Sequence, residues 1–255
     1  MNNRGFTYLA ALVCAAVAAA TAARAGEPRA VIELFTSQGC SSCPPADKLL
    51  GELANDPSLL TMTLPVDYWD YLGWKDTLAN QGHSKRQRAY SLARGDRDVY
   101  TPQAVINGVV HVLGSDRAAI EKAIAQTKQS AQPLAVPVTL KIADGKATVT
   151  VAAAGNDTDG KSSGEIWLCP ITNSAPVVIG RGENKGRTLT YHNVVRRWVK
   201  LGDWTGKAET FSVALSELPG NAYALDDIDQ LAVVLQSGVA AKPGVMLGAA
   251  QARLR

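Results

Sequence analysis

The sequence predicts an α/β domain followed by a mostly antiparallel β-sandwich-like domain, so that the whole chain is α+β. Three observations support this fold class. In the first half, short apolar runs typical of strands alternate with segments of helical periodicity. The composition changes near residues 130–136, where prolines interrupt the chain. After that point, short alternating segments are separated by turns rich in Gly, Asn and Asp, as in a sandwich or barrel-like unit.

The first half is expected to contain four strands and three helices. Leucines at helical spacing in ADKLLGELA indicate the first helix, and Asn107-Gly108 predicts a tight hairpin turn between the last two strands. The expected strands span residues 30–36, 59–67, 104–106 and 109–113, and the expected helices span residues 46–54, 84–94 and 116–128. The predicted order is therefore β, α, β, α, β-hairpin, α.

The second half is expected to consist of short strands. VPVTLKI and KATVTVA alternate around Asp144-Gly145, which is typical of a hairpin. Further strands are expected at residues 165–171, 177–180, 187–191, 194–201, 209–214 and 230–235. We therefore predict a first domain over residues 26–132 and a C-terminal β-rich domain over residues 133–255.

Residues 1–25 have the pattern of a secretory signal peptide. Arg4 precedes an apolar run over residues 6–23, and Ala23-Arg24-Ala25 fits a cleavage site. We expect the segment to be removed, which leaves no stable membrane insertion and places the protein in the periplasm or outside the cell. The chain has 26 Lys and Arg against 23 Asp and Glu. This near balance gives no electrostatic reason to expect a nucleic-acid partner.

Cys40, Cys43 and Cys169 remain after removal of the signal peptide. Cys40 and Cys43 follow the first strand at i, i+3 spacing, so both lie on one face if they open the next helix. A thiolate at a helix N-terminus is stabilised, so its pKa falls below the free value of about 8.5. We therefore expect Cys40 to attack a substrate disulfide and Cys43 to resolve the mixed disulfide. Cys169 is expected to be a free, buried strand cysteine.

Two other roles for the cysteine pair stay open. A three-residue loop restricts the unfolded chain only slightly, so the pair is a poor structural staple. Zinc requires four ligands, but there is no second Cys-x-x-Cys, and His83, His111 and His192 are scattered. Copper(I) on the two thiolates is the remaining metal alternative. The leading hypothesis requires no metal and no cofactor.

The first half resembles the thioredoxin superfamily. Cys40-Ser41-Ser42-Cys43 follows a strand, and Thr101-Pro102 precedes the last hairpin. The resemblance implies a thioredoxin-like domain with a cis-proline at Pro102, whose neighbouring backbone, with Thr101, pairs with an extended substrate. It also implies an acidic residue under the disulfide, for which Glu33 is the candidate, although its offset from Cys40 is one residue longer than usual.

IELFTSQGCSSCPPAD, VDYWDYLGW, VYTPQAVING and RGENKGRTLTYHNVVR are similar to a family of secreted bacterial proteins defined only as a domain of unknown function. This similarity covers nearly the whole chain after residue 25. Two features differ from ordinary thioredoxins: the Ser-Ser dipeptide between the cysteines, and the long segment of residues 68–97. These differences leave the direction of exchange and the partner open.

Aromatic residues gather directly after the second strand. Trp69, Tyr71 and Trp74 either line a substrate groove beside the disulfide or simply pack on the core. The segment RGEN, residues 181–184, is a further site candidate to which the sequence assigns no chemistry.

The leading hypothesis is extracytoplasmic thiol–disulfide exchange with protein or peptide thiols through Cys40 and Cys43. The rival is a secreted binding module on the same scaffold, for a metal ion such as copper or for a small ligand, without redox catalysis. The oligomeric state stays open.

Overall fold

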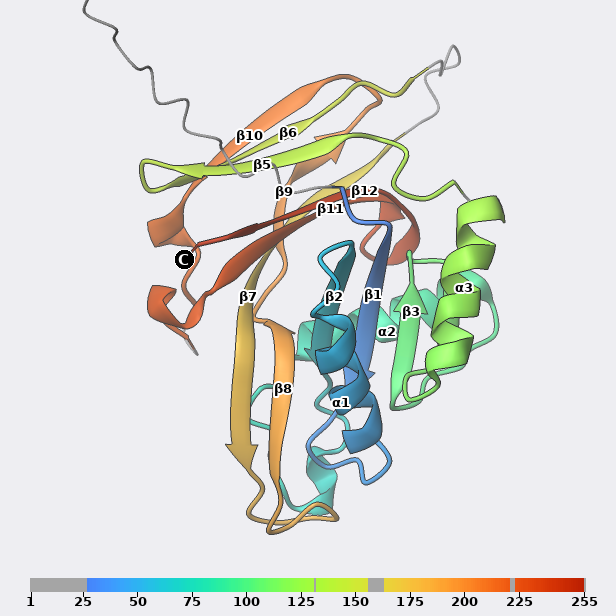
Figure 1. Ribbon diagram of the computed structural model, residues 1–255, viewed down its shortest axis with the longest axis vertical. Helices are drawn as coiled ribbons and strands as arrows, with labels where there is room; N and C mark the ends of the chain where they lie inside the picture. The colour runs from blue at the N-terminus through green and yellow to red at the C-terminus, as the bar shows by residue number, and fades with distance from the viewer. Residues whose placement is uncertain (1–26, 131, 156–162, 221–222, 255) are drawn as a thin grey trace, which may run out of the picture.

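The computed structural model describes residues 27–130, 132–155, 163–220 and 223–254. These residues are mostly β, with 43% strand and 22% helix in the chain. A mixed sheet of nine strands dominates the molecule, and a three-stranded sheet lies across one end of it (Figure 1). The predicted signal peptide, residues 1–25, lies outside the described residues.

The helices are α1 (Pro44–Leu53), α2 (Gln81–Arg94) and α3 (Arg117–Ser130), with 3-10 turns η1 (Asp70–Leu72), η2 (Leu215–Glu217) and η3 (Leu225–Asp227). The strands are β1 (Ala30–Thr36), β2 (Leu59–Pro65), β3 (Gln103–Ile106), β4 (Val110–Leu113), β5 (Val138–Ala143), β6 (Lys146–Val151), β7 (Gly164–Val178), β8 (Thr188–Val195), β9 (Val199–Trp204), β10 (Glu209–Ala214), β11 (Gln230–Val239) and β12 (Lys242–Arg253).

The predicted fold class, a thioredoxin-like α/β domain followed by a separate sandwich-like domain, is wrong. The large sheet has the order β12-β11-β7-β8-β2-β1-β3-β4, with β9 paired to β7, so strands from both halves share one sheet. The halves join where β2 runs parallel to β8, with Thr63 opposite Val194. Periodicity in a sequence shows that strands exist but not which strands pair. Here β8 covers the edge of β2 that would otherwise stay unpaired.

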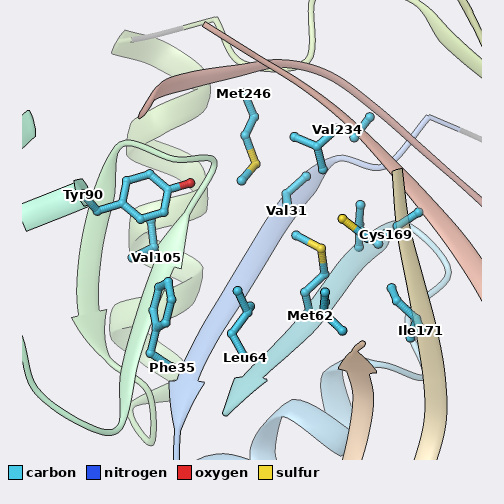
Figure 2. Close-up of a cluster of buried hydrophobic side chains, with 14 of the residues drawn as sticks. Val31, Phe35, Met62, Leu64, Tyr90, Val105, Cys169, Ile171, Val234 and Met246 are labelled. Carbon is cyan, nitrogen blue, oxygen red and sulfur yellow. The ribbon is translucent and has the colours of Figure 1, made fainter. Parts of the chain in front are cut away.

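One hydrophobic core also spans both halves. Its side chains come from β1, β2, α2 and β3 and equally from β7, β8, β11 and β12 (Figure 2). Phe35, Met62, Cys169 and Val234 are among its members, and all four are buried. Cys169 is a free cysteine, as predicted. Burial raises the pKa of its thiol far above the usual range.

The helices cover opposite faces of β1. Ile32 and Leu34 pack with leucines of α1 and with Ile120 of α3, whereas Val31 and Phe35 pack with Tyr90 of α2. Figure 1 shows α1 and α3 in front of the sheet and α2 behind it. Because strand side chains alternate between faces, this pattern determines which residues of β1 can lie beneath the disulfide.

The three-stranded sheet has the order β10-β6-β5. Its apolar face packs on β7, β9, β11 and β12 through a second core that includes the buried Trp204. The predicted hairpin around Asp144-Gly145 is confirmed, since both residues have positive φ and β5 pairs with β6 across them. In the part of the chain that the structure describes, no helix is both long enough and apolar enough to cross a membrane.

Candidate functional site

Cys40 and Cys43 form a disulfide in the turn between β1 and α1, with their Cα atoms 5.4 Å apart. The helix begins only at Pro44, and Cys43 is its N-cap residue. Both cysteines therefore precede the helix, whereas the sequence suggested that they open it. Pro44 and Pro45 occupy its first two positions, so these positions present no N–H group to the cysteines. Both cysteines are wholly buried.

The predicted cis-proline lies beside the disulfide. The Thr101–Pro102 peptide bond is cis, and the Thr101 carbonyl oxygen lies 3.8 Å from the Sγ atom of Cys40. The indole nitrogen of Trp69 donates a hydrogen bond of 2.9 Å to the Thr101 hydroxyl. The structure thus brings Trp69, Thr101 and Pro102 together with the cysteine pair.

The other two aromatic candidates lie elsewhere. Tyr71 is 79% exposed and belongs to η1. Trp74 supports the turn from behind, because its indole nitrogen donates a 2.8 Å hydrogen bond to the side-chain oxygen of Gln38. Its ring also fills the space over Gly180, where a Cβ atom would lie only 2.8 Å from it. Trp74 therefore buttresses the disulfide turn instead of lining a groove.

Glu33 is not beneath the disulfide. It faces the side of β1 that packs on α2, where its carboxylate pairs with Arg86 and accepts a hydrogen bond from the Tyr90 hydroxyl. Arg86 also donates to the side chain of Gln236 on β11. The structure therefore does not bring Glu33 and Cys43 together. It places Glu33 in a buried polar network between the two halves of the chain.

A different buried carboxyl group, that of Asp47 of α1, follows the disulfide by one helical turn. Its backbone N–H donates to the Cys43 carbonyl oxygen over 3.1 Å, and its Oδ1 accepts a 2.7 Å hydrogen bond from the Thr36 hydroxyl. The side chain is only 4% exposed, and Oδ2 has no hydrogen-bond partner among the described residues. Burial raises the pKa of Asp47 to about 8.

Asp47 lines a cavity of about 510 Å³ between α1 and β8, together with Pro44, Lys48, Arg187 and His192. This cavity gives solvent a route to the carboxyl group from the side of α1 that faces β8. Asp47 can therefore exchange a proton with water. Asp47 was not among the residues predicted from the sequence, although its position four residues after Cys43, on the same helical face, is a signal that could have found it.

The loop between β7 and β8, residues 179–187, is called the β7–β8 tip, and it covers the disulfide turn. The side chain of Asn184 is buried and donates to the carbonyl oxygens of Gln38 and Cys40, over 3.0 and 2.9 Å. The backbone N–H of Ser41 donates a 3.2 Å hydrogen bond to Glu183. The RGEN segment, singled out in the sequence without a chemistry, is thus part of the site.

Potential metal ligands cluster away from the cysteines. Asp96, Asp98 and His111 place one ligand atom each within 4.8 Å of the others, and within the described ranges they form the only group of three or more such residues. Arg94 already pairs with Asp96 over 2.6 Å. The two cysteines belong to no such group among the described residues.

The comparisons identify the family. Residues 31–236 match the family described as a protein of unknown function, DUF1223. The chain belongs to the DUF1223 family. Among solved structures, the crystal structure of protein AGR_C_4864 from Agrobacterium tumefaciens is 30% identical to this chain in sequence. The two superpose with a TM-score of 0.76, and the match covers 89% of this chain and 94% of that chain. HBP35 of Porphyromonas gingivalis is 15% identical, with a TM-score of 0.57 over 89% of this chain and 76% of that chain. No curated protein matches the chain.

The DUF1223 match includes every part of the candidate site. The disulfide, Asp47, Pro102 and the β7–β8 tip all fall within residues 31–236, and the matched region ends inside β11. The family therefore includes the strands that join the two halves, as well as the segment with the cysteines. The likeness to HBP35 concerns the fold alone.

Proposed function

We propose that the protein is an extracytoplasmic thiol–disulfide oxidoreductase that acts on protein or peptide thiols through Cys40 and Cys43. The observation that carries the proposal is the position of the disulfide beside the backbone of Thr101 and Pro102, one helical turn before a buried carboxyl group. Thr101 and Pro102 offer backbone next to Cys40, and Asp47 lies one turn after Cys43. This arrangement supports a relationship of the site to the thioredoxin superfamily.

The reaction in the reducing direction has two steps. The thiolate of Cys40 attacks one sulfur of the substrate disulfide, a mixed disulfide forms, and the other substrate sulfur leaves as a thiolate. Cys43 then transfers its proton to Oδ2 of Asp47 and attacks the Sγ atom of Cys40, which releases the second substrate thiolate. The protein loses two electrons and becomes the Cys40–Cys43 disulfide, while the substrate gains them.

Asp47 suits this role because burial places its pKa, about 8, close to the pKa of a thiol. A carboxyl group with an ordinary pKa would be a much weaker base toward a cysteine. The cavity between α1 and β8 then lets the proton pass to solvent after the second step.

The site suits a compartment in which disulfides persist. The predicted signal peptide and the Cys40–Cys43 disulfide both support export to the periplasm or beyond the cell.

Trapping of mixed disulfides tests the proposal. We expect Cys43→Ser to accumulate protein partners linked to Cys40 that reducing agents release, because the second step is blocked. Cys40→Ser, which lacks the attacking thiol, is the matched control and should trap none. The measurement is non-reducing electrophoresis of protein isolated from an exporting cell, followed by mass spectrometry of the Cys40 peptide. Equal trapping by both variants, or by neither, would contradict the proposal.

A further inference from the structure

The β7–β8 tip occupies the polar groups around Cys40. Asn184 bonds to the carbonyl oxygens before and at Cys40 and is oriented by Arg187, which donates to its Oδ1 over 2.9 Å. This contact fixes Glu183, the preceding residue, against the N–H group of Ser41. A segment some 140 residues away in the chain therefore contacts the turn that contains the disulfide.

A thiolate at Cys40 would find few hydrogen-bond donors. The N–H of Ser41 is already bonded to Glu183, and Pro44 and Pro45 supply no N–H at the start of α1. The Ser42 hydroxyl lies 3.4 Å from the Sγ atom of Cys40 and could donate to it. Thiolates with a low pKa instead depend on N–H groups of a helix N-terminus or on a neighbouring cation.

The charges in contact with the turn are also unfavourable to a thiolate. Glu183 bonds to Ser41, and Asp76 accepts a 2.8 Å hydrogen bond from the N–H of Gln38. The cation Arg187 reaches the turn through Asn184, to whose side-chain oxygen it donates. Arg181 and Lys185, exposed on the same tip, make no hydrogen bond or ion pair to the turn within the described residues.

We propose that Glu183 is a positioning residue that keeps reduced Cys40 protonated, so that the cysteine pair serves as a reductant of substrate disulfides and not as an oxidant. This inference rests on the proposed function and supplies its direction. A strongly oxidising pair is one whose reduced form is stabilised, chiefly through its thiolate. Glu183 removes that stabilisation by its negative charge and by holding the N–H of Ser41.

The proposal requires an electron donor. Each turnover converts the Cys40 and Cys43 thiols to the disulfide and a substrate disulfide to two thiols. A dithiol reductant with a lower potential must then reduce the pair again by the same exchange.

The pKa of Cys40 in a Cys43→Ser background is the direct test. We expect a value at or above the free value of about 8.5. Adding Glu183→Gln should lower the pKa by about one unit, a tenfold change in the acid constant, because the amide keeps the size of the side chain but lacks its charge. Glu217→Gln removes one exposed negative charge from η2 and should leave the pKa unchanged. The rate of iodoacetamide alkylation of Cys40 is measured on the Cys40 peptide over a range of pH. The midpoint of its pH dependence gives the pKa of each variant, even if burial lowers the alkylation rate at every pH.

The salt dependence separates charge from shape. Glu183 is exposed, so the difference between the two pKa values should shrink by more than half in 1 M NaCl, where the Debye length is about 3 Å. If the wild-type Cys40 pKa lies well below the free value, or if Glu183→Gln leaves it unchanged, the inference is overturned.

A second measurement uses the intact pair. In equilibrium with glutathione, the wild-type disulfide should resist reduction. A plot of the reduction potential of the pair against pH bends at the pKa of Cys40. In Glu183→Gln this bend should lie about one pH unit lower than in wild type. A wild-type pair that glutathione readily keeps reduced would be an oxidant, contrary to the proposal. Failure of the proposed function looks different: the pKa shift would appear as expected, but Cys43→Ser would trap no partner.

Discussion

Asp47 is the residue whose chemistry depends most on its surroundings. Its carboxyl group is buried, has one hydrogen bond from Thr36, and has one oxygen without a partner among the described residues. The same burial raises the pKa of the Tyr191 hydroxyl, to which the charges of Asp47 and Asp76 contribute. The neutral form of Asp47 is therefore favoured over a wide range of pH, and its ionisation has a cost for the folded protein.

Asp47→Asn should remove a pH dependence of stability. The pKa of Asp47 is about 8 in the folded protein, against an ordinary value of 3.8 for an aspartate, so the folded state holds its proton more tightly than the unfolded state. The free energy of unfolding should fall as pH rises from about 4 to about 8, by on the order of several kcal/mol at most, and then level off. Asparagine does not titrate, so the variant should lose this slope.

Urea denaturation of the oxidised protein between pH 4 and pH 9 measures the effect. Glu52→Gln, on the exposed side of the same helix, is the control and should keep the slope. If Asp47→Asn and wild type show parallel pH profiles, the pKa of the carboxyl group is not raised in the folded protein, and its carboxylate is too weak a base to accept the proton of Cys43.

Among the elements, the β3–β4 hairpin shows how a turn can also act as a docking point. Asn107 and Gly108 both have positive φ and form a tight turn in which the N–H of Val109 donates to the carbonyl oxygen of Ile106. The side-chain oxygen of Asn107 accepts a hydrogen bond from the N–H of Val31. The backbone carbonyl oxygen of Asn107 accepts a hydrogen bond from the N–H of Met246. A Cβ atom on Gly108 would lie 2.4 Å from the carbonyl oxygen of Gly244. The turn thus binds β12 by close backbone contact.

Gly108→Ala should destabilise the protein far more than Gly145→Ala. Both glycines have φ near +70°, at 74° and 71°, and both lie in the turn of a hairpin. Gly145 has open space around it, so alanine there should cost about 1–2 kcal/mol for the backbone conformation alone. At Gly108, the collision with β12 should add about 1–3 kcal/mol. Chemical denaturation of both variants measures the difference, and equal losses would show that the contact with β12 contributes nothing.

Local sequence predicted the elements of the first half well. The strand at residues 30–36, the first helix and the two turns of Asn-Gly or Asp-Gly type all depend on neighbouring residues, and the structure has them within a few positions. The strand partners were not predictable in this way. The parallel pairing of β2 with β8 joins segments about 130 residues apart, and no turn or periodicity in either strand specifies it.

The same distinction applies to the site. Cys40, Cys43 and Pro102 belong to short motifs and could be found from the sequence. Glu33 was chosen by its distance from Cys40 along the chain, but the alternation of strand side chains puts it on the face opposite Ile32 and Leu34, which pack on α1. Glu183 and Asn184 could not be assigned, because their role arises only when the β7–β8 tip reaches the disulfide turn.

At the scale of the whole molecule, a buried polar network joins the two halves. Arg86 of α2 pairs with Glu33 of β1 and donates to Gln236 of β11. Its guanidinium group also lies 3.9 Å from the ring centroid of Trp198, between β8 and β9. The nitrogen of the Gln236 amide donates to the hydroxyl of Tyr90. The network therefore joins three side chains of the first half of the chain to two of the second half. It lies within a hydrophobic core that also contains residues of both halves.

This arrangement predicts that the two halves unfold as one unit. Glu33→Gln leaves the charge of Arg86 buried without its anion, which should cost about 3–5 kcal/mol. Because the network and the core are shared, that loss should lower the protection of amides in β1 and in β11 by the same factor. Glu121→Gln breaks an exposed ion pair with Arg29 and should cost no more than about 1 kcal/mol.

Hydrogen exchange followed by peptide mass spectrometry reports each strand separately and therefore tests this prediction. In wild type, the most protected amides of β1 and β11 should open with the same free energy, since each strand lies inside the nine-stranded sheet. In Glu33→Gln, both should lose protection together, and the double variant Glu33→Gln, Arg86→Met should recover part of it because no buried charge is left unpaired. Loss of protection in β1 with β11 unaffected would mean that the halves fold independently, even though their strands share a sheet. The β7–β8 tip could then leave the disulfide turn without unfolding the domain that contains Cys40 and Cys43.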